Sequence, residues 1–382
     1  MAPRWRCGMN ETLKSLRFTL LAVVAALVVS AFIIVITDIE ALGNGEFATP
    51  FRTLGTAYWG LFKGSFGSLR AVSNTITGAT PLLLAGLAVS SAFKAGLFNI
   101  GATGQMLAGA MGGLWVGFAF QLPPIIHVPL ALLAAAVGGA LFGAIPGALK
   151  ARTGAHEVIT TIMLNGIASF TVLWLLKTEL FKREGRDDAI SRFVKDSAKL
   201  PKLFGFMGKR IDLLAHYGFA VALLATLVFW WLLRKTTLGF EMQATGLNQD
   251  AARYAGMRTK SLMVVSMAIA GAFAGLAGGS EVLGLYGYAS ATVAGDIGFD
   301  AIAVALLGRS TPVGTLVSAL LFGALQAGGR QMQVDTDVPI DLIIVMRALI
   351  VMFIAAPLLV KAMFRVKGEA KVFGQTFRGW GG

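Results

Sequence analysis

Side-chain amides lie inside one uncharged, glycine-rich stretch of the sequence, GLFNIGATGQMLAGA at 96–110. Asn99 and Gln105 each carry donors and an acceptor, so they can hydrogen-bond a polar solute or can tie neighbouring helices together. Asn165 lies in a second uncharged stretch, where an unpartnered amide costs on the order of several kcal/mol. Its partner is therefore either a neighbouring helix or solvent in a polar path.

This stretch has a faint internal echo. The segments NIGATGQMLAGA, from Asn99, and DIGFDAIAVALL, from Asp296, share Ile-Gly, each preceded by a polar residue. Paired, interrupted hydrophobic segments indicate a transport site at the bilayer midplane, where unwound backbone is tolerated only within protein or along a cavity. Phenylalanines beside the two Ile-Gly breaks can stack on a planar ring or simply pack. The predicted substrate path consists of Phe98, Asn99, Gln105, Asn165, Phe299 and Asp300.

Ionisable residues within or near uncharged runs give an alternative chemistry. Glu281, Asp300 and Arg347 are of this kind, and intramembrane charges are functional candidates by default. Together they would form the relay of an ion-coupled secondary transporter of a small polar solute. No metal site is expected, because Cys7 is the single cysteine and HEVIT at 156–160 lacks the second histidine of H-E-x-x-H. No catalytic constellation indicates an enzyme.

The elements that must position these residues are membrane helices. The chain is 56% hydrophobic and 14% charged, with a mean hydropathy of +0.72, and soluble domains average about a quarter charged residues. A segment at 342–360 is interrupted by Arg347, and 297–308 is too short for a full crossing. We expect an all-α polytopic membrane protein with about ten transmembrane helices, some short or broken near the midplane. The long uncharged windows are 18–36, 71–93, 95–120, 128–149, 158–176, 217–233, 262–280 and 313–329.

Lysine and arginine in the loops predict the orientation of these helices. Ten crossings place both termini in the cytoplasm and the loop 177–213, with its ten basic and six acidic residues, outside. The net charge of +13 then serves orientation and lipid headgroups, and no basic patch with interleaved aromatics indicates nucleic acid. The expected organisation is a single transmembrane domain over 1–382. Its parts are the helix 18–36, the groups 71–176 and 262–360, and a cytoplasmic tail 361–382.

Glycines at four-residue spacing predict where helices pack closely. They occur in three of the uncharged windows, and this spacing places them on one helix face. The three sets are Gly109, Gly113 and Gly117; Gly139, Gly143 and Gly147; and Gly271, Gly275 and Gly279.

The segment RKTTLGFEMQATGLNQDAARYAGMRTK at 234–260 is too polar to cross a membrane. Asn248 can cap a short helix with Asp250 in its first turn, and Gly256 can end it. Ala251 and Ala252 give this helix a smooth face, and Tyr254 an aromatic contact. Such a helix suits docking into a groove on a soluble partner, or it lies as an amphipathic helix on the membrane surface.

Four segments carry a resemblance to a known family. DAARYAG at 250–256 resembles the E-A-A-x-x-x-G coupling signature of ABC importer permeases, with Asp250 in place of Glu. Three others are similar to permeases of nucleoside and simple-sugar importers, relatives of the ribose permease in the branched-chain-type superfamily. They are TPLLLAGLAVSSAFKAGLFNIGATGQ at 80–105, EVITTIMLNGIA at 157–168 and GFDAIAVALLG at 298–308. Two departures are Thr103, where relatives often have Glu, and His156, where they often have Asn.

The resemblance implies a non-catalytic permease subunit in a bacterial plasma membrane. Its partners would be an ABC ATPase subunit that holds ATP and Mg, a second permease chain and an extracytoplasmic substrate-binding protein. This chain itself lacks G-x-x-x-x-G-K-[ST], and no cofactor is expected on it. The residues expected to couple it to the ATPase are Gly246, Asn248, Asp250, Ala251, Ala252, Tyr254 and Gly256.

Overall fold

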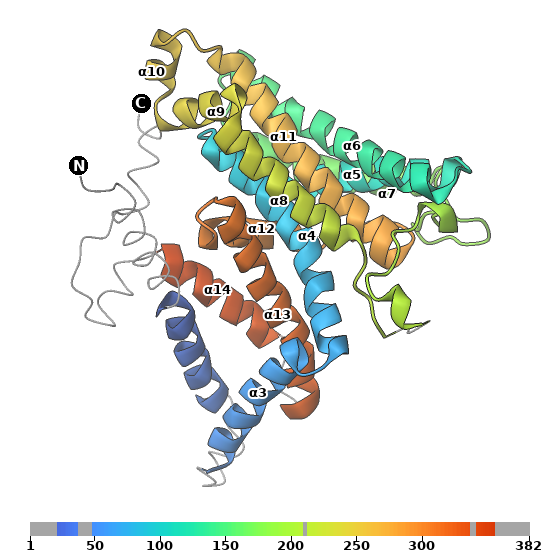
Figure 1. The fold of residues 1–382 in the computed structure, drawn as a ribbon, viewed down its shortest axis with the longest axis vertical. Helices are drawn as coiled ribbons and strands as arrows, with labels where there is room; N and C mark the ends of the chain where they lie inside the picture. Colours follow the sequence, from blue (N-terminus) through green and yellow to red (C-terminus); the bar gives the residue numbers. More distant parts are fainter. Residues whose placement is uncertain (1–20, 37–47, 209–211, 337–340, 356–382) are drawn as a thin grey trace. The chain divides into compact units, whose positions relative to one another are not determined.

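The computed structural model describes residues 21–36, 48–208, 212–336 and 341–355, and the ordered elements within these ranges are helices (Figure 1). The predicted all-α class is confirmed for this part of the chain, where only isolated β-bridges occur outside the helices. Six helices are long and apolar enough to cross a membrane. They are α4 (Leu69–Lys94), α6 (Pro124–Thr153), α7 (Glu157–Leu175), α8 (Gly218–Lys235), α11 with η3 (Thr259–Tyr286) and α13 (Pro312–Thr336).

Seven further α-helices lie in the described ranges. They are Leu21–Ile36, α3 (Ala48–Phe66), α5 (Ala102–Ala119), α9 (Thr237–Leu247), α10 (Gln249–Tyr254), α12 (Ile297–Leu307) and α14 (Asp341–Ala355). The prediction that 297–308 forms a short element is confirmed by α12. The first three residues of the predicted helix 18–36, the end of 342–360 and the tail 361–382 lie outside the described residues.

The chain divides into two compact units. The first comprises Val72–Ala324, and the second comprises segments from both ends of the chain, up to Ala71 and from Leu325. In the second unit, Tyr58 of α3 donates a hydrogen bond to the carbonyl of Leu27, 2.5 Å away. A methyl group on Gly328 would lie 2.2 Å from the carbonyl oxygen of Leu61, so α13 and α3 pack backbone against backbone.

The core of the first unit is a three-helix contact among α5, α6 and α11, which lie side by side (Figure 1). A methyl group on Gly139 of α6 would lie 2.1 Å from the carbonyl oxygen of Gly271 on α11. One on Gly109 of α5 would lie 2.2 Å from the Cα of Gly275. The three predicted glycine stripes therefore face one another, and their missing side chains let the backbones touch. This prediction is confirmed.

The outer faces of this core suit hydrocarbon. Only 22% of the apolar window of α6 is buried, and 17% of that of α7, against 83% for α4. A row of exposed apolar side chains runs the length of α6 and repeats mostly every fourth residue, so it occupies one face. Its members are Ile125, Leu133, Val137, Leu141, Ile145 and Leu149.

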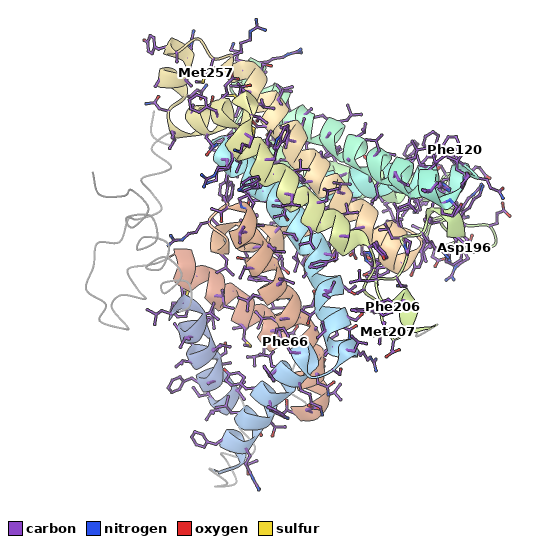
Figure 2. All side chains as sticks on the ribbon, viewed as in Figure 1. Phe66, Phe120, Asp196, Phe206, Met207 and Met257 are labelled. Carbon is purple, nitrogen blue, oxygen red and sulfur yellow. The ribbon has the colours of Figure 1, made fainter. Side chains whose placement is uncertain are left out.

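The segment 177–208 between α7 and α8 packs over one end of the core. Lys195 donates its backbone N–H to the carbonyl of Gly117 over 3.0 Å, and Leu200 donates to Leu283 over 2.8 Å. The buried His127 contacts the hydroxyl of Ser197 at 2.8 Å through Nδ1. Phe120 and Asp196 lie at this end of the first unit and Met257 at the opposite end (Figure 2).

His216, just before α8, is buried in the neutral form. Its ring packs against Gly218 and Gly284, and Nδ1 accepts a hydrogen bond from the N–H of Gly218 at 3.1 Å. Burial, with a smaller contribution from Lys202, lowers the pKa of His216 from 6.5 to about 4. Protonation at Nδ1 would remove the acceptor for Gly218.

This burial predicts acid sensitivity. The imidazole binds a proton more tightly in the unfolded chain than in the folded chain. The free energy of unfolding therefore keeps its full value above pH 6.5 and decreases by roughly 3 kcal/mol as the pH falls towards 4. We expect the unfolding temperature of the purified protein to fall over this range, and His216→Gln to flatten that slope. An equal slope in wild type and His216→Gln would contradict the assignment.

Candidate functional site

The helical path breaks between α4 and α5. α4 ends at Lys94 and α5 begins at Ala102, so the first seven residues of the predicted span 95–120 are not helical. Gly96 turns the chain with a φ of +72°, a conformation that favours glycine. The predicted broken helix therefore lies at the start of this window, where the amides are.

The amides of Asn99 and Gln105 bind each other across the break. Asn99 Nδ2 donates to Gln105 Oε1 at 2.9 Å, and Gln105 Nε2 donates to Asn99 Oδ1 at 3.2 Å. The same Oδ1 accepts from the N–H of Gly101 at 2.9 Å, and both side chains are at most 1% exposed. We call this arrangement the amide lock. It satisfies a backbone donor that has no helical partner at the start of α5.

Asn165 of α7 holds the same break from the side. Its Oδ1 accepts from the N–H of Gly104 at 2.8 Å, and its Nδ2 donates to the carbonyl of Ile100 at 2.9 Å. Of the two partners considered for this amide, the structure shows protein backbone. Whether any of these amides also contacts substrate stays a prediction.

The two echoing segments meet in space. α12 begins at Ile297, and a methyl group on Gly298 would lie 2.1 Å from Thr103 Oγ1 and 2.6 Å from its backbone nitrogen. Thr103 Oγ1 is buried and has no hydrogen-bond partner among the residues that the structure describes. The first turns of α5 and α12 are thus in direct contact, and the partial positive charges of both helix N-termini lie together.

The other predicted path residues surround this contact unevenly. Phe299 is 58% exposed, and Asp300 is half-buried in the first turn of α12. Phe98 packs its ring against Phe93, with the ring centroids 4.9 Å apart. A largely exposed phenylalanine beside two helix N-termini could contact a passing ring, whereas Phe98 already has a partner.

The three residues of the alternative ion-coupled relay lie on three different elements. Glu281 is 3% exposed and begins the π-helical turn η3 (Glu281–Tyr286), and Asp300 lies on α12. Both belong to the first unit, whereas Arg347 lies on α14 in the second.

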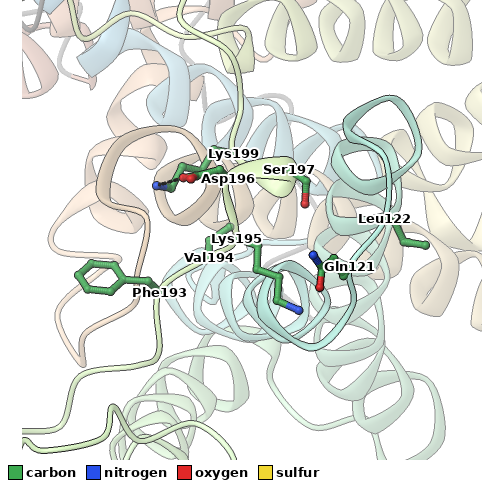
Figure 3. A pocket seen from close by; sticks show the side chains of 8 residues that line it. All are labelled: Gln121, Leu122, Phe193, Val194, Lys195, Asp196, Ser197 and Lys199. Atoms are coloured by element: carbon green, nitrogen blue, oxygen red, sulfur yellow. Dashed lines mark hydrogen bonds and ion pairs between the residues drawn. The ribbon is translucent and has the colours of Figure 1, made fainter.

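A groove of about 860 Å³ lies at the end covered by 177–208 (Figure 3). Lys195 and Gln121 both line it, and Lys199 pairs with Asp196 at 2.6 Å (Figure 3). Residues of the predicted path do not line it. The lining residues are Gln121, Leu122, Phe193, Val194, Lys195, Asp196, Ser197 and Lys199.

The segment 234–260 forms two helices where the sequence predicted one. α9 is fixed to α8, since Gln243 Nε2 donates to the carbonyls of Leu233 and Gly239, each at 3.0 Å. Asn248 then caps α10 as predicted, because its Oδ1 accepts from the N–H of Ala251 at 2.9 Å. This cap joins the two helices at a single residue.

Gly256 ends α10 as predicted. It has a φ of +83°, and the N–H of Met257 reaches back to the carbonyl of Ala252 at 3.0 Å. Ala252 is buried, whereas Tyr254 is 94% exposed; Asp250 and Ala251 are exposed as well. The exposed side of α10 is therefore open to a partner.

Gly246, also among the predicted coupling residues, lies elsewhere. It packs inward, and a methyl group there would lie 2.4 Å from the carbonyl oxygen of Lys94 and 2.8 Å from the nitrogen of Gly96. Sequence reasoning missed Gly96 and Gly298 as contact positions. Both glycines stand in the quoted motifs, but the sequence does not show which backbone each one approaches.

Comparison with known proteins identifies the family of the chain. The profile of the family described as branched-chain amino acid transport system / permease component matches residues 71–360. The chain is 40% identical to the guanosine ABC transporter permease protein NupP of Bacillus subtilis, over 91% of this chain and 95% of that protein. No solved structure matches the chain.

Two further relatives are named as a glucose permease and as a second guanosine permease. The glucose ABC transporter permease protein TsgB13 of Haloferax volcanii is 37% identical over 84% of this chain and 86% of that protein. The guanosine ABC transporter permease protein NupQ of Bacillus subtilis is 29% identical over 67% of this chain and 80% of that protein. The chain therefore belongs to the branched-chain amino acid transport system / permease component family.

Proposed function

We propose that this chain is the permease subunit of an ATP-driven ABC importer and forms the translocation path for nucleosides or related simple sugars. The observation that carries the proposal is the similarity to a guanosine permease across nearly the full length of both chains. The glucose permease among the relatives extends the substrate class to sugars. The buried polar break and the contact of α5 with α12 support a path at this position.

The proposed assembly has four kinds of protein. An ABC ATPase subunit, holding ATP and Mg, docks on the exposed side of α10, and this chain binds no cofactor and carries out no catalysis. A second, homologous permease completes the path, as the two different guanosine permeases of one Bacillus strain suggest. An extracytoplasmic binding protein delivers substrate.

The proposed topology follows the charge distribution. Residues 1–382 form one transmembrane domain with about ten crossings in a bacterial plasma membrane, with both termini and α10 in the cytoplasm and 177–213 outside. In support, the segment 177–208 and Met257 lie at opposite ends of the first unit (Figure 2).

Uptake of radiolabelled nucleosides and pentoses tests this function, in cells with the gene, without it, or with Gly256→Arg. Arginine at a φ of +83° strains the end of α10, although it meets no neighbour within 4 Å. We expect nucleoside uptake to be lost in both altered strains. Gly154→Arg is the matched control, since that glycine has a φ of +74° and equally open space, and should retain uptake.

Each other outcome is informative. Uptake that is lost on deletion but retained with Gly256→Arg would contradict the ATP-coupled mechanism and favour the ion-coupled transporter. Loss of pentose uptake alone would keep the mechanism and change the substrate.

A further inference from the structure

Gly96 and Gly246 form a backbone contact between the break and α9. A methyl group on Gly96 would lie 2.9 Å from the Cα of Gly246 and 3.3 Å from its carbonyl oxygen. From the other side, a methyl group on Gly246 would approach three backbone atoms, of Lys94, Ala95 and Gly96, within 2.9 Å. No side chain separates the two segments, so neither can shift towards the other without displacing it.

On one side of this contact lies the helix pair that ends in α10. Gly246 is the last residue but one of α9, and Asn248 follows it as the cap of α10. The N–H of Asn248 also binds the carbonyl of Ala244 at 3.1 Å. Met242 and Thr245, on the same helix, are buried. A displacement of α10 therefore reaches Gly246 through the single capping residue Asn248.

On the other side lies the amide lock. Only Leu97 and Phe98 separate Gly96 from Asn99, whose side chain holds Gln105 and the N–H of Gly101. α5 starts immediately beyond, in contact with Gly298 of α12. A shift of Gly96 therefore acts within a few residues on the first turns of both short helices.

We propose that the Gly96–Gly246 contact is the joint that transmits movement of α10 to the break between α4 and α5. This inference rests on the proposed function, because α10 moves only if an ATPase acts on it. The contact biases whether the amide lock is closed, as in this structure, or open. Glycine is needed at both positions because any side chain there would push the two backbones apart.

The test uses the complete transporter, purified with its ATPase and reconstituted in vesicles with binding protein. Gly246→Ala is compared with Gly166→Ala, whose new methyl group meets nothing within 4 Å. We expect Gly246→Ala to keep ATP hydrolysis near the wild-type rate while uptake per ATP falls about tenfold, a coupling loss of ordinary size. Gly166→Ala should match wild type in both. Full coupling in Gly246→Ala would overturn the inference.

If Gly246→Ala does not assemble, hydrogen exchange on the wild-type complex tests whether movement of α10 reaches the break. The N–H of Gly101 is held by Asn99, so its exchange reports the lock, and the N–H of Gly104 is held by Asn165, so its exchange reports the same break from the side of α7. We expect a non-hydrolysable ATP analogue to speed exchange in peptides covering 99–105. Unchanged exchange there, in a transporter whose uptake requires ATP, would overturn the joint. Wild-type uptake that needs no ATPase would instead refute the proposed function.

Discussion

Gly139→Leu should abolish accumulation of folded protein in the membrane, whereas Gly166→Leu should leave it close to wild type. Even a methyl group at Gly139 would lie 2.1 Å from the carbonyl oxygen of Gly271 and 2.6 Å from the Cα of Gly275. These are backbone atoms, which cannot rotate away as a side chain can. The helices must therefore separate and lose their contact, a change that belongs with the exceptional substitutions above about 4 kcal/mol.

Detergent extraction followed by size-exclusion chromatography of a fluorescent fusion measures this effect. Gly166 is the matched control because it lies exposed on α7, where an added methyl group would meet no other part of the described chain within 4 Å. A monodisperse Gly139→Leu protein with wild-type unfolding temperature would show that α6 and α11 do not pack as described.

Asn99→Leu should destabilise the protein by about 2–5 kcal/mol, because it strips partners from two buried groups. The amide of Gln105 loses both of its hydrogen bonds, and the N–H of Gly101 loses its acceptor. Gln105→Leu should also destabilise. The double substitution should cost less than the sum of the two, since each single change leaves the other amide unpaired.

Thermal unfolding of the four proteins in one detergent gives this cycle. Gln121→Leu, at an exposed amide, is the control and should have no comparable effect. The competing role, a direct substrate contact, predicts a different result: Asn99→Leu would keep the wild-type unfolding temperature and raise the substrate concentration needed for half-maximal uptake. The cycle thus separates a lock from a ligand-binding group.

The helical class was predictable because long uncharged runs have few other physical solutions. The rule fails at α3, whose sequence carries Arg52 and Lys63 and so contains no long uncharged window. The absence of charge also does not show where α5 begins, since 95–101 is as uncharged as the helix that follows. Uncharged length therefore locates apolar, membrane-compatible segments better than it locates helix ends.

The sequence predicted which residues belong to the candidate site better than it predicted what each residue contacts. The caps at Asn248 and Gly256 are local, and local rules predict them. Asn99 and Gln105 were found because amides are costly in hydrocarbon, but their sequence spacing does not say that they bind each other. The meeting of Gly96 with Gly246, or of Gly298 with Thr103, depends on tertiary packing alone.

The exposed apolar row on α6 is longer than the hydrocarbon layer of a typical bilayer. From Ile125 to Leu149 the row measures about 36 Å at 1.5 Å per residue, whereas the hydrocarbon layer is ~30 Å thick. α6 must therefore tilt, or the surrounding lipid must stretch to match it. Because glycine backbones join α6 to α11 and α11 to α5, a tilt imposed by lipid reaches the helix that begins at the amide lock. We therefore expect acyl-chain length to change the tilt of α6 and, through these contacts, the position of α5, without a lipid-binding site.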